Sequence, residues 1–138
     1  MAGTVHRLRE PGESEKLTIN LGYVDLGRID LLVSEGFYSN RSDFIRTAVR
    51  NQLGAHAEAV NQSIGRQTLE LGIREYRRAD LEVLRKAGET LSIRVLGLAR
   101  IADDVTPELA RATIQSITVL GALQASSEVK AALAGRIR

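Results

Sequence analysis

The segment KLTINL, residues 16–21, alternates strictly between polar and apolar side chains. This period of two predicts a half-buried β-strand. A strand of six residues is not stable alone, because its backbone groups and its apolar face both need a partner. The residues that follow have a helical pattern instead, and the next β-like segment lies far downstream. We therefore predict that this strand pairs with the same strand of a second copy.

Two amphipathic helices are predicted directly after the strand. In the first, apolar residues recur at helical spacing between Val24 and Ser34, and Gly36 suits the position after its C-terminus. Asn40 suits the N-cap of the second helix, and Asp43 stands three residues later, as in a capping box. We expect this second helix to continue to about Val60. Its buried stripe would consist of Phe44, Ile45, Ala48, Val49 and Leu53.

The segment EKLTINLGYVDLGRIDLLVSEGFYSNRSDFIRTAVRNQL, residues 15–53, resembles the ribbon-helix-helix DNA-binding family of CopG, Arc and MetJ type. The strand and the SNRSDFIR start of the second helix occur in the family's order and at its spacing. Gly22 stands where many members carry proline, a departure that affects only the turn. The resemblance implies an intertwined homodimer whose two antiparallel strands enter the major groove of DNA. The dimer core that it implies consists of Leu17, Ile19, Leu21, Ile29, Phe44, Ile45 and Val49.

The resemblance assigns base contacts to the outward side chains of the strand, Lys16, Thr18 and Asn20. Their chemistry suits that role. Lysine donates to guanine acceptors, asparagine can bond adenine with two hydrogen bonds, and threonine offers a hydroxyl and a methyl group. The alternative is that these residues form the solvated face of a sheet.

The resemblance also assigns phosphate contacts to Asn40, Arg41 and Ser42, through free backbone N–H groups at a helix N-terminus. A helix cap alone would account for these residues, although capping and phosphate binding can coexist. The charge of this part of the chain does not distinguish phosphate binding from a helix cap alone. The net charge is +2, but residues 1–56 contain seven basic and seven acidic residues.

The C-terminal half contains a weak internal repeat. SIRVLGLARIADDV, from Ser92, matches SITVLGALQASSEV, from Ser116, at an offset of 24 residues, and LELGI at residues 69–73 is a fainter echo. Such a period is typical of stacked equivalent units. We favour a small β-rich domain of stacked strands over an all-helical alternative. The segments RRADLEVLRKAGETL and TPELARAT would be turns or short helices, and SSEVKAALAGRIR a terminal helix or a last stacked unit.

The predicted fold class is therefore α+β, with an N-terminal ribbon-helix-helix module and a small, β-rich, repeat-like C-terminal domain. The expected divisions are a flexible arm at residues 1–14, the DNA-binding domain at 15–60, a linker at 61–67 and the C-terminal domain at 68–138.

Several functional classes are disfavoured by composition. The chain has no cysteine, and its only histidines, His6 and His56, precede the C-terminal half, so we expect no metal site and no cofactor. Asp103 and Asp104 are neighbours that we interpret as a solvated turn. No phosphate-binding glycine loop or nucleophile–base set is present, so we do not expect an enzyme. With no signal peptide or membrane-spanning run, we expect a cytoplasmic, nucleoid-associated protein.

The sequence thus predicts a sequence-specific transcriptional regulator, a repressor, that binds double-stranded DNA as a homodimer. Stacked strands leave open edges, so we expect the C-terminal domain to assemble dimers further. A compact domain that binds a signal or partner protein is the alternative role for this half. Two other functions remain open. One is an antitoxin, whose tail would be disordered until it bound a toxin, and the other is a structural or segregation protein that assembles on DNA.

Overall fold

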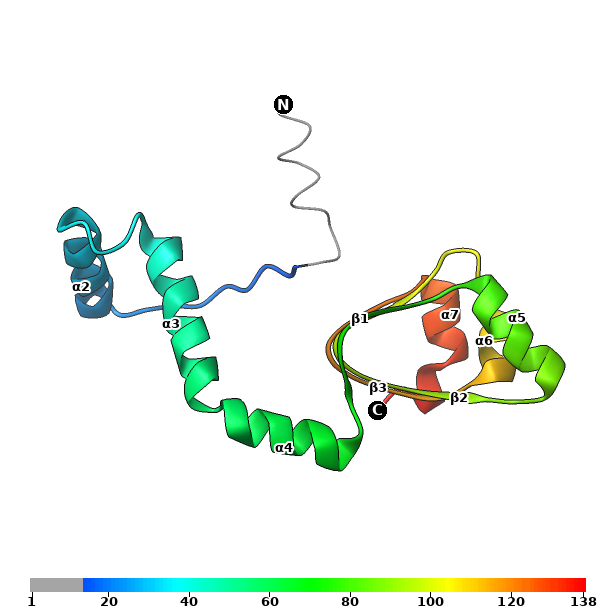
Figure 1. Ribbon diagram of the computed structural model, residues 1–138. Coiled ribbons are helices and arrows are strands. Elements are labelled where there is room, and N and C mark those ends of the chain that lie inside the picture. The colour runs from blue at the N-terminus through cyan, green and yellow to red at the C-terminus, as the bar shows by residue number, and fades with distance from the viewer. Residues whose placement is uncertain (1–13) are drawn as a thin grey trace. The chain divides into compact units, whose positions relative to one another are not determined.

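The computed structural model of the chain describes residues 14–138 and separates them into two compact units, 14–63 and 64–138. Each unit is described by itself (Figure 1). The expected arm at residues 1–14 lies outside the described residues, apart from its last position.

The N-terminal unit contains α2 (Tyr23–Ser34), α3 (Arg41–Ala55) and the first part of α4 (Ala57–Gln67). Helix α2 ends at Ser34, and Gly36 follows its C-cap residue with a φ of +87°, a conformation accessible to glycine. There the N–H of Gly36 donates to the carbonyl of Val33, and the N–H of Phe37 donates to that of Leu32. These two bonds form a Schellman motif, which satisfies the last carbonyls of the helix.

The second helix differs from its predicted extent. It ends at Ala55 instead of continuing to about Val60, and a new helix, α4, begins at Ala57. Residues 61–67, expected as a linker, are the second half of α4. The polar residues and the glycine of this segment predict a boundary, and the division between the two units, after Ser63, does lie within it. The segment is nevertheless helical, because a helix tolerates such residues when one face is solvated.

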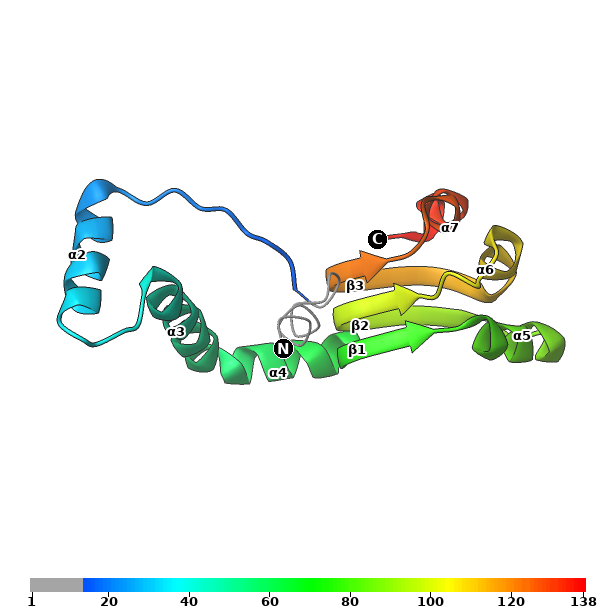
Figure 2. The ribbon, with the colours of Figure 1, turned by 90° about the horizontal axis from the view of Figure 1, so that it is seen from above.

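The predicted strand at residues 16–21 has no ladder partner among the described residues. Figure 2 shows residues 14–22 as an extended segment before α2. Leu17 is 83% exposed and Ile19 is 55% exposed. A strand is defined by the hydrogen bonds of its ladder, and residues 14–138 of a single chain give this segment no strand to pair with.

The C-terminal unit alternates strands and helices. Its elements are β1 (Glu70–Tyr76), α5 (Arg78–Ala87), β2 (Leu91–Ile101), α6 (Pro107–Thr113), β3 (Ile114–Gln124), α7 (Ser127–Ala132) and the 3₁₀ turn η1 (Ala134–Arg136). The strands form one parallel sheet in the order β1-β2-β3. The helices that follow them lie together on one side of the curved sheet (Figure 1). The unit therefore contains strands, as expected, but it is not mainly β because helices connect them. The all-helical alternative is wrong.

Local signals explain why the connections are helical. In α5, the carboxylate of Asp80 accepts from the N–H of Arg77, and Gly88 ends the helix with a φ of +70°. The hydroxyl of Thr106 caps α6 by accepting from the N–H of Leu109, and Pro107 occupies the first helical position. Ser126 caps α7 in the same way.

The two segments with the 24-residue offset lie side by side in the sheet. Ser92 pairs with Ser116, Val95 with Val119, and Gly97 with Gly121. The fainter echo upstream also lies in this register, because Gly72 pairs with Gly97. The core between sheet and helices is apolar and well covered. Its members include Tyr76, Leu81, Ile93, Val95, Ile101, Leu109, Ile114, Ile117, Val129 and Leu133.

Candidate nucleic-acid interface

The extended segment before α2 presents both polar and apolar side chains to solvent in the single chain. Lys16, Thr18 and Asn20, the predicted base-contacting residues, are all exposed. Because side chains alternate along an extended strand, these three would lie opposite Leu17, Ile19 and Leu21. Leucine and isoleucine side chains that are left open to water in this way indicate a surface that another chain covers.

An apolar hollow of about 700 Å³ opens between this segment and the two helices. Six of the seven predicted dimer-core residues line it, the exception being Leu17. Ile29 is buried within the unit, whereas Val49 is 52% exposed. The lining consists of Ile19, Leu21, Asp25, Arg28, Ile29, Leu32, Phe44, Ile45, Ala48, Val49 and Gln52.

The turn between α2 and α3 is held by side-chain contacts that fix the start of α3. The Asn40 side chain accepts from the N–H of Asp43 at 2.8 Å, and the Asp43 carboxylate accepts from the N–H of Ser39 at 2.9 Å. The predicted N-cap is thereby confirmed. The rings of Tyr38 and Phe44 pack edge to face, with centroids 5.1 Å apart.

Arg41 makes a contact that sequence reasoning did not find. Its Nε and Nη2 atoms donate to the two carboxylate oxygens of Asp30, each at 2.8 Å. This bidentate pair joins α2 to the first turn of α3. The two residues are eleven positions apart on different helices, so no local pattern could have indicated their pairing. The contact engages the guanidinium of Arg41, whereas the predicted phosphate contact uses the backbone N–H groups at the start of this helix.

The pair shifts the titration of both groups. Hydrogen bonds from Arg41 hold the pKa of the Asp30 carboxyl below its ordinary value of 3.8, and Asp30 raises the pKa of the guanidinium. Because the folded-state pKa of Asp30 is lowered, its contribution to stability is present above pH 3.8. That contribution is lost as the pH falls through the lowered value.

We expect Arg41→Ala to raise the titration midpoint of Asp30 toward 3.8, because the substitution removes both hydrogen bonds that favour the ionised carboxylate. Carboxyl-carbon NMR measured against pH would follow this midpoint directly. Arg46→Ala is the matched control, since Arg46 is an exposed arginine on the same helix. An unchanged Asp30 midpoint in Arg41→Ala would mean that the pair does not form in solution.

The backbone at the start of α3 keeps donors available. The first N–H groups of a helix have no partner within it. Asn40 satisfies the N–H of Asp43, and the N–H of Phe44 donates to the carbonyl of Asn40. The N–H groups of Arg41 and Ser42 come before these, at the positive end of the helix dipole. This geometry suits an anion such as a DNA phosphate.

Within residues 14–138, no three histidine, aspartate or glutamate side chains come together as a metal-binding group. None of the helices in the same range is long and apolar enough to cross a membrane.

Comparison with known proteins extends the match beyond the N-terminal unit. The sequence matches the Ribbon-Helix-Helix transcriptional regulator family over residues 12–130, a range that reaches α7 and therefore includes the sheet. No match is found among curated proteins or solved structures. Because the family match covers most of the 138 residues, the chain belongs to the ribbon-helix-helix transcriptional regulators, whose members bind DNA as dimers.

Proposed function

We propose that the protein is a sequence-specific repressor whose homodimer pairs residues 16–21 of both chains as an antiparallel ribbon. The observation that carries this proposal is the apolar hollow beside Ile19 and Leu21, which a second copy of the same unit would fill. Pairing would give the strand its missing ladder and would remove Leu17 from water.

In this dimer the outward side chains of the ribbon make the base contacts. Two strands present Lys16, Thr18 and Asn20 twice, related by the dimer axis, so the preferred site is a short palindrome. The residues 1–56 are formally neutral in total. Attraction to the phosphate backbone is therefore modest, and specificity depends on the placement of these six side chains.

The start of α3 fixes the ribbon on the DNA backbone. A phosphate accepts from the N–H groups of Arg41 and Ser42 and from the hydroxyl of Ser42. With its guanidinium held by Asp30, Arg41 acts by orienting the helix end and by contributing charge. Such contacts position the protein and carry no base preference. Bound dimers would repress by blocking access of the transcription machinery to the site.

The test begins with selection of a preferred duplex from a random library by the full chain. Dissociation constants for this duplex and for a scrambled one are then measured at one salt concentration. We expect the combined change Lys16→Ala, Thr18→Ala and Asn20→Ala to reduce the ratio of the two affinities by on the order of a hundredfold. The physical reason is the loss of the base-edge hydrogen bonds.

Lys86→Ala serves as the control, because it removes one exposed lysine from α5 in the other unit. It should leave the ratio as in the unchanged protein. Arg41→Ala should weaken binding to both duplexes by similar factors, since phosphate contacts are shared by all sequences. A triple variant that still discriminates as well as the unchanged protein would exclude the ribbon as the base-contacting element.

A further inference from the structure

The parallel sheet of the C-terminal unit has two open edges. Among residues 14–138, the outer edge of β1 pairs with no strand. The outer edge of β3 has one short contact, in which Ile137 pairs with Ile117 and the N–H of Arg138 donates to the carbonyl of Ile117. From Thr118 to Gln124 this edge is free within the described chain.

Strand β3 lacks the features by which soluble proteins usually protect an edge strand, whereas β1 contains the charged residues Glu70, Arg74 and Glu75. Strand β3 has no charged residue and no proline from Ile114 to Gln124. Leu120 is 51% exposed there, and on β1 Leu71 is 69% exposed. Charged side chains and prolines are the common means of preventing an edge strand from pairing with another chain. Their absence from β3 favours an edge that pairs.

A row of glycines has the same geometry in all three strands. Gly72, Gly97 and Gly121 are in register and have φ values of +124°, +139° and +122°. A Cβ atom at Gly97 would collide with the carbonyl group of Gly72, and one at Gly121 would collide with that of Gly97. Gly97 and Gly121 therefore each lie directly against the backbone of the preceding strand.

The row is incomplete at both ends. Nothing lies within 4 Å of the position where a Cβ atom of Gly72 would point, although its backbone has the same shape as that of Gly97. At the other end, the carbonyl of Gly121 has no following glycine against it. The outer edges of β1 and β3 are thus the two complementary sides of the glycine contact, which the chain already makes between β1 and β2 and between β2 and β3.

We propose that β1 of one copy pairs in parallel with β3 of a second copy, so that the sheet continues from chain to chain. The register of the existing ladder fixes the partners. Glu70 and Val95 are paired, as are Val95 and Val119, so Glu70 of the second copy takes the place beside Val119. The remaining rows are Leu71 beside Leu120, Gly72 beside Gly121, Ile73 beside Ala122 and Glu75 beside Gln124.

The short contact at Ile137 is compatible with this arrangement. Ile137 occupies the register of Ile117, and β1 of the second copy would begin two positions further along, at Val119. The two segments would use successive parts of one edge. Strand β1, with seven residues, is shorter than the other two strands, and in this register its first six residues lie opposite positions 119–124 of β3.

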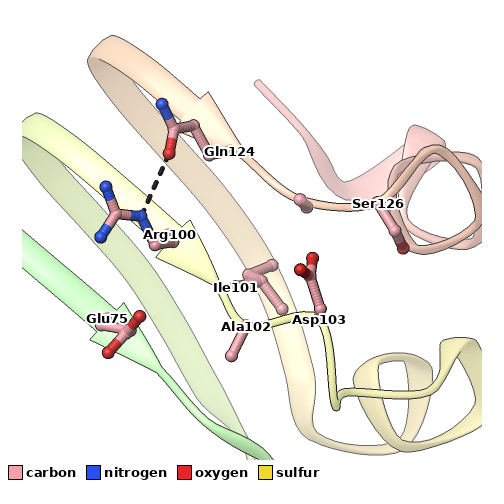
Figure 3. A pocket seen from close by; sticks show the side chains of 8 residues that line it. Glu75, Arg100, Ile101, Ala102, Asp103, Gln124 and Ser126 are labelled. Carbon is pink, nitrogen blue, oxygen red and sulfur yellow. Dashed lines mark hydrogen bonds between the residues drawn. The ribbon is translucent and has the colours of Figure 1, made fainter. Parts of the chain in front are cut away.

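The polar side chains at the ends of the strands are also compatible with the proposed pairing of β1 with β3. Figure 3 shows Glu75, Arg100 and Gln124 on neighbouring strands around a hollow of about 330 Å³. The Nε of Arg100 donates to the Oε1 of Gln124 at 3.1 Å, which leaves the amide NH₂ of Gln124 as a donor. In the continued sheet, the carboxylate of Glu75 from the second copy would stand next to that donor.

Pairing of β1 with β3 joins two different surfaces, so it generates an open row of copies instead of a closed pair. Each ribbon-helix-helix dimer carries two C-terminal units, so one dimer can link to several others. Neighbouring dimers on DNA would then reinforce one another's binding. This inference is separate from the base contacts, because the residues involved belong to the other unit.

The experiment compares edge variants of the full chain without DNA, by sedimentation over a range of protein concentrations. We expect the unchanged protein to assemble beyond two chains as the concentration rises. Leu71→Lys and Leu120→Lys should each weaken this assembly by on the order of a hundredfold, because each takes an unpaired charge into the contact. Val83→Lys is the matched control, since Val83 is a similarly exposed residue on α5. It should assemble like the unchanged protein.

Mixing the two edge variants distinguishes this contact from a symmetric one. Leu71→Lys keeps an intact β3 edge and Leu120→Lys an intact β1 edge, so their equimolar mixture should regain larger assemblies that neither variant forms alone. Retained dimers and retained DNA binding in both variants would show that the ribbon is unaffected. The proposal would be overturned if the unchanged protein stayed at two chains at every concentration. It would also be overturned if Leu71→Lys, without the other variant, assembled as readily as the unchanged protein. Loss in Leu71→Lys with none in Leu120→Lys would overturn it in favour of β1 pairing with β1.

Discussion

Val49→Asp is expected to separate the ribbon-helix-helix dimer into single chains and to abolish binding to the selected duplex. Val49 lines the hollow beside Ile29 and Ile45, and it is half-exposed in the single chain. In the dimer it would be buried twice, once from each chain. An unpaired carboxylate in an apolar contact costs about 3 kcal/mol or more, so two should weaken dimerisation by at least roughly ten-thousandfold.

Asn51→Asp is the matched control for this variant. Asn51 is exposed on the same helix, does not line the hollow, and gains the same charge. Sedimentation would be measured in a Leu71→Lys background, so that edge pairing of the sheets does not contribute. Val49→Asp should sediment as one chain and lose affinity for DNA, whereas Asn51→Asp should remain a dimer. A dimeric, DNA-binding Val49→Asp would mean that the hollow does not face a second copy.

The parts of the N-terminal unit that the sequence predicts correctly are those set by local chemistry. The cap formed by Asn40 and Asp43, and the helix end at Gly36, depend on residues within a few positions of one another. Alternation in residues 16–21 predicts a strand that needs another chain, and the exposed Leu17 agrees with that need. The roles of these side chains on DNA stay predictions.

Contacts between distant residues were beyond sequence reasoning. Asp30 and Arg41 meet because α2 and α3 pack together, and neither residue type nor spacing indicates this. The break between α3 and α4 at His56 was missed for a related reason, since residues on both sides favour helix equally well. The repeat at Ser92 and Ser116 indicated which positions correspond, but not that helices would connect them.

Two glycines of that repeat, Gly97 and Gly121, each lie against a carbonyl group of the neighbouring strand, where a side chain has no room. Gly97→Ala is expected to destabilise the sheet of the C-terminal unit strongly. Alanine is strained at a φ of +139°, and its Cβ would lie within 3.0 Å of the carbonyl carbon of Gly72. Strain and overpacking each cost about 1–3 kcal/mol. Their sum of about 4 kcal/mol is a large share of the roughly 5–15 kcal/mol that stabilises a domain.

Hydrogen exchange followed by mass spectrometry would resolve the two units separately. Amide protection across β2 should fall by about three orders of magnitude in Gly97→Ala, while protection in α2 and α3 should be retained. Gly65→Ala is the control, because Gly65 lies within α4 and no atom outside its own helix is near its Cβ position. That change should be neutral or stabilising by about 1 kcal/mol, as expected for alanine inside a helix. Equal protection of β2 in both variants would mean that the strands are not packed against each other at the glycine row.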